Sequence, residues 1–472
     1  MGSRRRTTVV VIAAAALVAL PGLGGCRRND PPASAAGAAR NVAAPRAVLN
    51  AGSCSSSGCH AAAVEGHAAW QSAYTVWASR DRHRRAYEVL QEPLARQIVA
   101  ALAVRDPSRA HPPAHENQAC LGCHATERRV AMADGVSCES CHGPAGDWLV
   151  AHTLPGWKTR GNTLGMVDLA DPFACASQCG QCHIGGPPGP DGALHEVSHD
   201  LIAAGHPRLT FELRSFKAAE PPHWRDRFAA GGDDGGPLRE WALGRLGGLD
   251  TYLAQFATQA AAAADDPVEA RRSGAAGAWP EFTAFDCYGC HRPAVAPIDR
   301  GLAALVSPAG TRLGSPRLDP MAWSLLRVIL PPDAAQTLIA FRGEAEANWW
   351  RPPSQASIEE CRRVIAHARP EIAGRLAAVG AAELARDMVA GIDATSWDQA
   401  VSATRALTAL VDQRAATNDA SAARKRLTTL RALLEFPEGD LGGRRVRFDG
   451  PQGYDPVRVR AELQAIAESL AD

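Results

Sequence analysis

One pattern occurs three times between residues 120 and 183, as Cys120-Leu-Gly-Cys123-His124, Cys138-Glu-Ser-Cys141-His142 and Cys179-Gly-Gln-Cys182-His183. Two thiols at this spacing add to the two vinyl groups of one haem, and the next His then lies under the iron as an axial ligand. A zinc ribbon would need four ligands around one metal and no His after every second Cys. A thioredoxin-like pair would occur once rather than in series. The repeats therefore predict covalently bound c-type haems, around which the rest of the chain must fold.

Two further Cys-Cys-His units flank these three. Cys287-Tyr-Gly-Cys290-His291 keeps the ordinary spacing, whereas Cys54-Ser-Ser-Ser-Gly-Cys59-His60 has four residues between its thiols. Two alternatives stay open for the longer unit, a haem held by Cys59 alone and a small disulfide loop. The five units use ten of the 13 cysteines and predict five covalent haems. Cys175 and Cys361 are left over, either as buried free thiols or as a pair with each other.

Residues 1–25 have the features of a bacterial export signal. Three arginines and a short apolar run precede Leu23-Gly24-Gly25-Cys26, which resembles the lipobox of a lipoprotein. Cleavage there would leave Cys26 as a lipidated N-terminus that anchors the chain without spanning the membrane. The alternative is an ordinary secretory signal with an incidental Cys. On either reading we expect the protein on the periplasmic side of a bacterial membrane, with residues 26–50 as a flexible tether.

The charge balance bears on the class of partner. The chain has 50 basic and 50 acidic residues, so its formal net charge is zero and we expect no nucleic-acid partner. Nearly all the basic residues are Arg, which pairs well with the two propionates that each haem brings. We expect redox proteins or quinol-linked membrane donors as partners instead.

The motifs and their surroundings resemble a known family. The segments that carry the resemblance are Trp77-Ala-Ser-Arg-Asp-Arg-His83, Gly135-Val-Ser-Cys-Glu-Ser-Cys-His-Gly-Pro144, Ala204-Gly-His-Pro-Arg-Leu209 and Trp279-Pro-Glu-Phe282. They are similar to segments of the multihaem cytochromes c related to hydroxylamine oxidoreductase and its tetrahaem electron acceptor. The resemblance covers about residues 50 to 300. It implies a mostly helical fold built on closely packed haems, usually with two His ligands per iron and sometimes with one open iron.

The second axial ligands must come from His residues outside the motifs. The candidates are His83, His152, His199 and His206, with His115 in fifth place and His67, His111, His195 and His223 as its alternatives. His152 lies ten residues past His142, so we expect it to serve a different haem. His199 and His206 are predicted to share a helix that Gly205 and Pro207 end, and to reach two irons. If no His fills the fifth place, one iron would be open to a small ligand.

The predicted fold is mainly α with little sheet, as a pentahaem cytochrome c domain over residues 51–300 and a helical region without haem over residues 301–472. In the first region, a stripe at helical period predicts a long scaffold helix through Leu238, Trp241, Leu246, Leu249, Leu253 and Phe256. In the second, helical patterns cover Glu383 to Gly391, Trp397 to Ala415, Ala422 to Leu434 and Val457 to Leu470. We expect this region to cover the haem domain or to dock a partner.

Two classes of function remain, an electron carrier and an oxidoreductase that acts on a small nitrogen or sulfur compound at one open iron. The pentahaem nitrite reductases use Lys in place of the motif His at the catalytic haem, and this chain has no Cys-x-x-Cys-Lys. Ten His residues lie outside the motifs, more than five irons require. Both observations favour electron transfer over catalysis.

Overall fold

The computed structural model describes residues 46–108, 110–126, 132–157, 162–186, 195–223, 236–263, 279–287, 316–394, 396–415, 420–435, 438–441, 444–447 and 454–470. The export signal with Cys26 lies outside these residues, as do Cys290 and His291 of the fifth motif. The mainly α fold predicted from the sequence is confirmed. Within the described ranges the two strands that pair in a sheet are β1 (Glu438–Leu441) and β2 (Arg444–Arg447), which run antiparallel.

The first part of the chain forms short helices joined by loops. They are η1 (Ala51–Cys54), α1 (Ala73–Arg80), η2 (Arg82–Arg85), η3 (Glu88–Gln91), α2 (Pro93–Arg105), α3 (Gln118–His124), η4 (Met132–Asp134), α4 (Cys138–His142), η5 (Ala151–Thr153), η7 (Asn162–Leu164), α5 (Pro172–His183), α6 (His199–Ala203) and α7 (Leu213–Ala219). Their apolar clusters are small; one consists of Leu90, Ala95, Ala114, Leu121 and Ala125. Side chains alone therefore give this part little core, as expected where porphyrin faces supply apolar surface.

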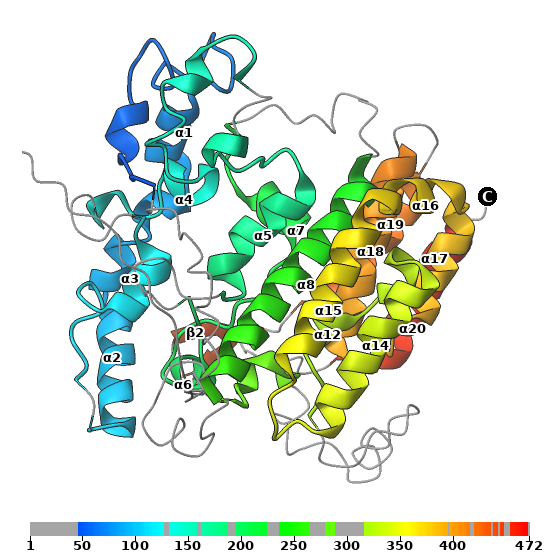
Figure 1. Ribbon diagram of the computed structural model, residues 1–472. Coiled ribbons are helices and arrows are strands. Elements are labelled where there is room, and N and C mark those ends of the chain that lie inside the picture. The colour runs from blue at the N-terminus through cyan, green and yellow to red at the C-terminus, as the bar shows by residue number, and fades with distance from the viewer. Residues whose placement is uncertain are drawn as a thin grey trace, which may run out of the picture. The chain divides into compact units, whose positions relative to one another are not determined.

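Helix α8 (Gly236–Ala263) lies between the two halves of the chain. It packs against α5 and α7 of the first half and against helices of the second half (Figure 1). Trp241, Leu246, Leu253 and Phe256 are fully buried on it, which confirms the predicted stripe. At Gly247 a Cβ would collide with the carbonyl oxygen of Phe173, so this glycine lets α5 approach α8 closely. The scaffold helix thus fixes the helix that carries the Cys179 motif.

The second half is a helical assembly with one large core. After η8 (Phe282–Ala284) come α12 (Pro320–Trp323), α13 (Leu326–Ile329), α14 (Pro332–Ala347), α15 (Gln355–Ala368), η9 (Arg369–Glu371), α16 (Ile372–Ala378), α17 (Ala381–Ala390), α18 (Trp397–Ala415), α19 (Ser421–Leu434) and α20 (Pro456–Ser469). The four helices predicted here appear as α17, α18, α19 and α20, with bounds that differ by two residues at most. Its core includes Trp323, Ile329, Leu407, Leu430 and Leu463 and is continuous with the buried side chains of α8.

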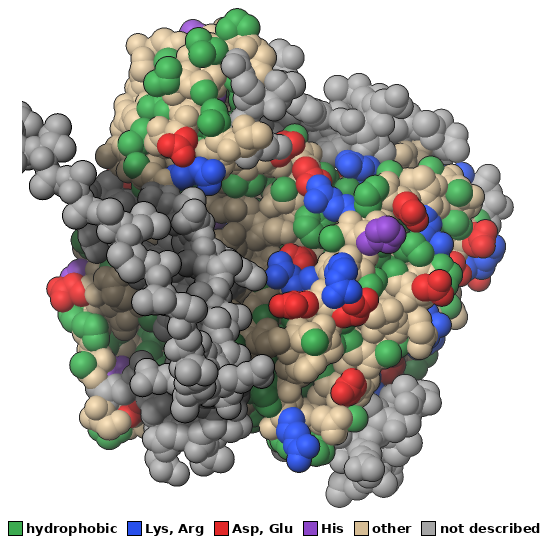
Figure 2. Space-filling view, viewed as in Figure 1, with side chains coloured by type: hydrophobic (Ala, Val, Ile, Leu, Met, Phe, Trp, Pro, Cys, Tyr) green, Lys and Arg blue, Asp and Glu red, His purple; other side chains and the backbone are tan. Residues whose placement is uncertain are grey.

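Two surface properties bear on partners. On the face in Figure 2, acidic and basic side chains are interspersed over the C-terminal helices rather than gathered by sign. Among the described residues, none of the helices combines the length and the apolarity that crossing a membrane requires.

Candidate haem sites

Three motifs lie on helices that end with the motif His. Helices α3, α4 and α5 end at His124, His142 and His183. Residues three apart on a helix lie on one side of it, so both thiols of each motif face the same way. Helix α5 begins where the carboxylate of Asp171 accepts hydrogen bonds from the backbone N–H groups of Phe173 and Ala174. Local capping thus fixes the start of the helix that carries the Cys179 motif.

The first unit and one distal candidate come together. The rings of His60 and His152 are nearly parallel, at 14°, and their centres are 6.2 Å apart. His60 Nδ1 is 2.6 Å from the carbonyl oxygen of Trp70, and His152 Nδ1 is hydrogen bonded to the carbonyl oxygen of Leu149. Each ring is held through Nδ1, which leaves Nε2 for a metal.

Two more pairs have the same composition, one motif His and one His from outside the motifs. The ring centres of His83 and His183 are 6.0 Å apart, and those of His124 and His206 are 6.5 Å apart. Asp81 Oδ1 lies 3.0 Å from His83 Nδ1. Nδ1 of His124 lies 2.7 Å from a backbone carbonyl oxygen, and Nδ1 of His206 lies 2.9 Å from another. Three of the distal candidates thus lie next to three different motif histidines.

Burial favours the neutral form of His142, His183, His124 and His206. It lowers the pKa of His142 and of His183 to about 4, and it lowers the pKa of His124 and His206 as well. The pKa of His83 is raised instead, because Asp81 hydrogen bonds to its ring. A neutral imidazole is the form that binds a metal, so burial prepares these side chains for ligation.

The Cys138 motif lies among the other described motifs. The thiols of Cys54 and Cys138 are hydrogen bonded to each other. Ser140 links the motif to its two neighbours: its Oγ is 2.6 Å from Thr126 Oγ1, and its carbonyl oxygen accepts a 2.5 Å hydrogen bond from Gln178 Nε2. The neighbouring imidazoles that further lower the pKa of His142 belong to His223, His60 and His152. Direct contacts therefore join this motif to the three others.

Two distal candidates lie elsewhere. His115 is at the surface, with Nε2 3.5 Å from Glu116 Oε1, and among the described residues it forms no ring pair with a motif His. His199 packs against Phe282 at 5.7 Å between ring centres, and its backbone N–H donates to Glu281 Oε1. His199 is therefore beside the segment that leads to Cys287, the part of the fifth motif that the structure describes.

The shared helix predicted for His199 and His206 is wrong. Helix α6 ends at Ala203, and Gly205 has a φ of 114°, which turns the chain before His206. The left-handed region is open to glycine at little cost, so the turn follows from this residue type. His206 is thereby directed to His124 independently of His199.

Cys175 and Cys361 are both buried free thiols, so the alternative of a disulfide between them is excluded.

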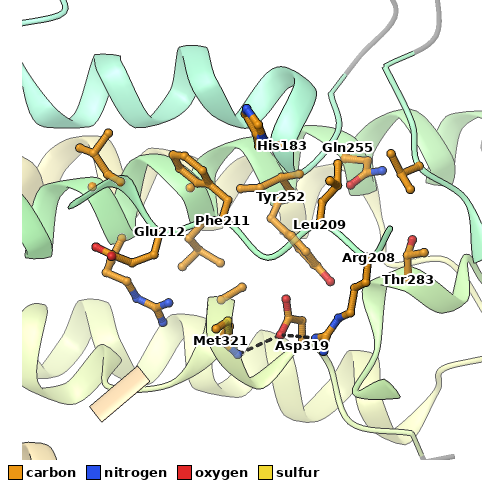
Figure 3. Close-up of a pocket in the computed structure, with 18 of the residues that line it drawn as sticks. His183, Arg208, Leu209, Phe211, Glu212, Tyr252, Gln255, Thr283, Asp319 and Met321 are labelled. Atoms are coloured by element: carbon orange, nitrogen blue, oxygen red, sulfur yellow. Dashed lines mark hydrogen bonds and ion pairs between the residues drawn. The ribbon is translucent and has the colours of Figure 1, made fainter. Parts of the chain in front are cut away.

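A cavity lies beside α8 (Figure 3). Its walls come from α8, from the segment Arg208 to Leu213, from Cys287 and from Asp319 to Ala322. His183 lines it as well, so the cavity joins the fourth and fifth motifs. The hydroxyl of Tyr252 donates a 2.6 Å hydrogen bond to the carbonyl oxygen of Ala284, which fixes the segment before Cys287 on α8.

Charged residues meet at one end of this cavity. Arg208 Nη2 is 3.2 Å from Asp398 Oδ2 and 3.9 Å from Asp319 Oδ1. Asp398 is fully buried, and this burial raises its pKa to about 7 against the opposing effect of Arg208. Burial lowers the pKa of Arg245 to about 10, which still leaves it charged at neutral pH. Sequence reasoning missed Arg245, Asp319 and Asp398. It singled out only Arg208, as part of the segment Ala204 to Leu209.

Comparison with known proteins agrees with the motif pattern. Residues 53–143 match the family described as cytochrome c554 and c-prime. Neither among curated proteins nor among solved structures does any relative match this chain. The matched residues contain the first three Cys-Cys-His units and one ring of each of the three His pairs. It supports a multihaem c-type cytochrome with covalent haem and a role in electron transport.

Proposed function

We propose that this multihaem c-type cytochrome carries electrons through five closely packed haems, most of them bound by two His ligands. The observation that carries the proposal is the set of three imidazole pairs. Each pair joins a motif His, which covalent attachment places under an iron, to a His from another part of the chain. Haem supplies the reversible one-electron chemistry of iron; the chain supplies the ligands and their surroundings.

The separation of the rings supports this ligand assignment. Bonds from a metal to imidazole nitrogen are about 2.0–2.1 Å long, so two imidazoles on opposite sides of one metal have ring centres about 6 Å apart. The three pairs lie at 6.2, 6.0 and 6.5 Å. We therefore assign His152, His83 and His206 as the distal partners of His60, His183 and His124.

The hydrogen bonds of these rings support the same assignment. Nδ1 of His60, His152, His124 and His206 meets a backbone carbonyl oxygen. Metal-bound His residues typically donate their second N–H in this way, which fixes the tautomer and the orientation of the ring.

The contacts between motifs support transfer from haem to haem. The Cys138 motif touches the Cys54 motif through its thiol, and through Ser140 it touches the segments that follow Cys123 and carry Cys179. For the iron at His142 we propose His223 as the distal ligand: of the three imidazoles near His142, His60 is a motif His and His152 is paired with it, which leaves His223. His199 stays the candidate for the fifth haem, since it lies beside the segment before Cys287.

The cellular location and the redox partners that we propose are inferred from the sequence. The lipobox-like Leu23 to Cys26 supports a lipid anchor at Cys26 on the periplasmic side of a membrane. Redox proteins or quinol-linked membrane donors then fit as electron donors and acceptors. An iron bound by two protein ligands is not free to bind a substrate, which sets this function apart from that of a catalytic oxidoreductase.

Low-temperature electron paramagnetic resonance of the oxidised holoprotein tests the proposal. Irons with two His ligands give low-spin signals, and an open iron gives a high-spin signal. We expect low-spin iron to dominate, with at least the three paired sites in that state. A spectrum with mostly high-spin iron that changes on adding cyanide would contradict electron transfer and favour the oxidoreductase alternative.

A further inference from the structure

The cavity beside α8 has the chemistry of a site for an apolar ring with acidic groups. Leu209, Phe211, Leu249 and Met321 give it apolar walls, and Arg208 and Arg245 give it positive charge. Haem combines a flat apolar ring with two propionates. Cys287 lines the same cavity, so a thioether bond from this residue would place the ring edge at its wall.

Arg245 shows an unmet need for an anion. Its Nε is buried without a hydrogen-bond partner, and its Nη2 makes long contacts of 3.4 and 3.5 Å with the carbonyl oxygen and hydroxyl of Ser324. Burying a charged guanidinium without a partner is costly. A ligand carboxylate in the cavity would supply the missing acceptor.

The carboxylates near Arg245 already have other partners. Glu212 accepts hydrogen bonds from the backbone N–H groups of Arg214 and Ser215, which start α7. Asp319 accepts from the backbone N–H of Met321 at 2.9 Å, as the dashed line in Figure 3 shows. Neither carboxylate has a hydrogen bond to Arg245 among the described contacts. The protein thus leaves this charge for an occupant of the cavity.

Gly248 leaves space on the cavity side of α8. A Cβ at this position would be 3.5 Å from Ile184 Cδ1 and 3.8 Å from Phe211 Cδ1, which are ordinary contacts. Packing between protein atoms therefore does not demand glycine here, although glycine in a helix costs roughly 0.5–1 kcal/mol relative to alanine. Glycine at position 248 is explained if this face of α8 lies flat against the ring of a ligand in the cavity.

We propose that this cavity seats the haem carried by Cys287, that Arg245 receives one of its propionates, and that Asp319 to Ala322 of the C-terminal half form part of its wall. The inference rests on the proposed attachment of a fifth haem. It gives the C-terminal helices a direct part in haem binding, where the sequence indicated only a cover. It also puts this haem next to the one attached at the Cys179 motif, because His183 lines the same cavity.

A redox titration of single and combined variants tests the assignment. Arg245→Gln removes a positive charge near one haem, so the reduced state loses stabilisation and one midpoint potential should fall. The same change in a Cys287→Ser, Cys290→Ser background should shift nothing, because that protein lacks the haem that Arg245 serves. Arg245→Lys keeps the charge and should retain most of the parental potential.

Arg342→Gln is the matched control. Arg342 Nη1 donates to the carbonyl oxygen of Trp323 at 3.4 Å, much as Arg245 contacts Ser324, but Arg342 does not line the cavity. We expect its substitution to leave all five potentials in place. A shift that persists in the Cys287→Ser, Cys290→Ser background, or no shift in the parent background, would overturn the assignment.

Haem content separates this inference from the function on which it rests. Intact mass should show one haem fewer in the Cys287→Ser, Cys290→Ser protein than in the parent. An equal number would show that Cys287 carries no haem and would overturn the cavity assignment. Electron transfer through the paired haems would stand in that case, because its test is the low-spin signal of the oxidised protein.

Discussion

Asp81 Oδ1 lies 3.0 Å from Nδ1 of His83, and the Asp81 side chain is buried. The other paired histidines with a described Nδ1 contact meet backbone carbonyl oxygens, so His83 differs in having a carboxylate. Glu220 Oε1 adds a second carboxylate at 3.6 Å from the same nitrogen. A carboxylate makes the imidazole a stronger donor and stabilises ferric iron. The iron between His83 and His183 should therefore have the lowest potential of the three paired irons.

Asp81→Asn should raise that potential. The Asn side chain retains an oxygen that can accept the hydrogen bond from the backbone N–H of His83, as Asp81 does, but it lacks the negative charge. A change of about 1.4 kcal/mol corresponds to about 59 mV for a one-electron couple, so we expect a rise on the order of 50–100 mV. Redox titration measures it. Asp147→Asn is the control, since Asp147 is exposed and pairs with Arg46; an equal rise there, or none at Asp81, would contradict the prediction.

Removal of a distal His should open one iron without releasing its haem. His152→Ala, His83→Ala and His206→Ala each delete one axial ligand, while the thioethers still hold the porphyrin. Intact mass should stay that of the full complement, and optical and paramagnetic resonance spectra should show one high-spin iron that binds cyanide or carbon monoxide. His115→Ala is the control and should stay low spin. A low-spin spectrum in His152→Ala would remove that residue from the ligands.

The sequence predicted what is local and missed what depends on distant contacts. Attachment motifs and helices such as α18 follow from short-range spacing, and both were found. The partner of each distal His was not predictable, because His60 and His152 are distant in the chain and meet only through tertiary packing. Nothing in the sequence distinguishes Arg245 from the other arginines, since its unpartnered Nε arises from burial. Gly205 was predicted to end a helix, but only the structure shows that its φ of 114° turns the chain before His206.

The number of attached haems should depend on the first unit. Cys54 and Cys59 are separated by four residues, and Cys54 contacts Cys138 rather than forming a loop with Cys59. We expect the mature protein to have the mass of five haems, and Cys54→Ser, Cys59→Ser to have that of four. Reduction before the measurement controls for disulfides. A parent with four haems and both thiols of this unit free would remove it from the attachment sites.

The buried acid Asp398 should make stability depend on pH. Its pKa in the folded state is about 7, above the usual 3.8, so folding favours the protonated form. Its effect is therefore most favourable below about pH 4, weakens as pH rises through 7, and is constant above that. The difference corresponds to roughly 4 kcal/mol at most, since each pKa unit is about 1.36 kcal/mol and the pKa of about 7 already includes the opposing effect of Arg208.

Asp398→Asn should remove this dependence, because the amide resembles the protonated acid at every pH. Thermal unfolding of the holoprotein at pH 5 and pH 8 measures the effect: the parent should lose more stability between these values than the variant does. Asp412→Asn is the control, since Asp412 also pairs with an arginine, Arg214, but is more exposed. If the parent and Asp398→Asn lose stability equally over this range, Asp398 is ionised throughout and its bond to Arg208 outweighs the cost of burial.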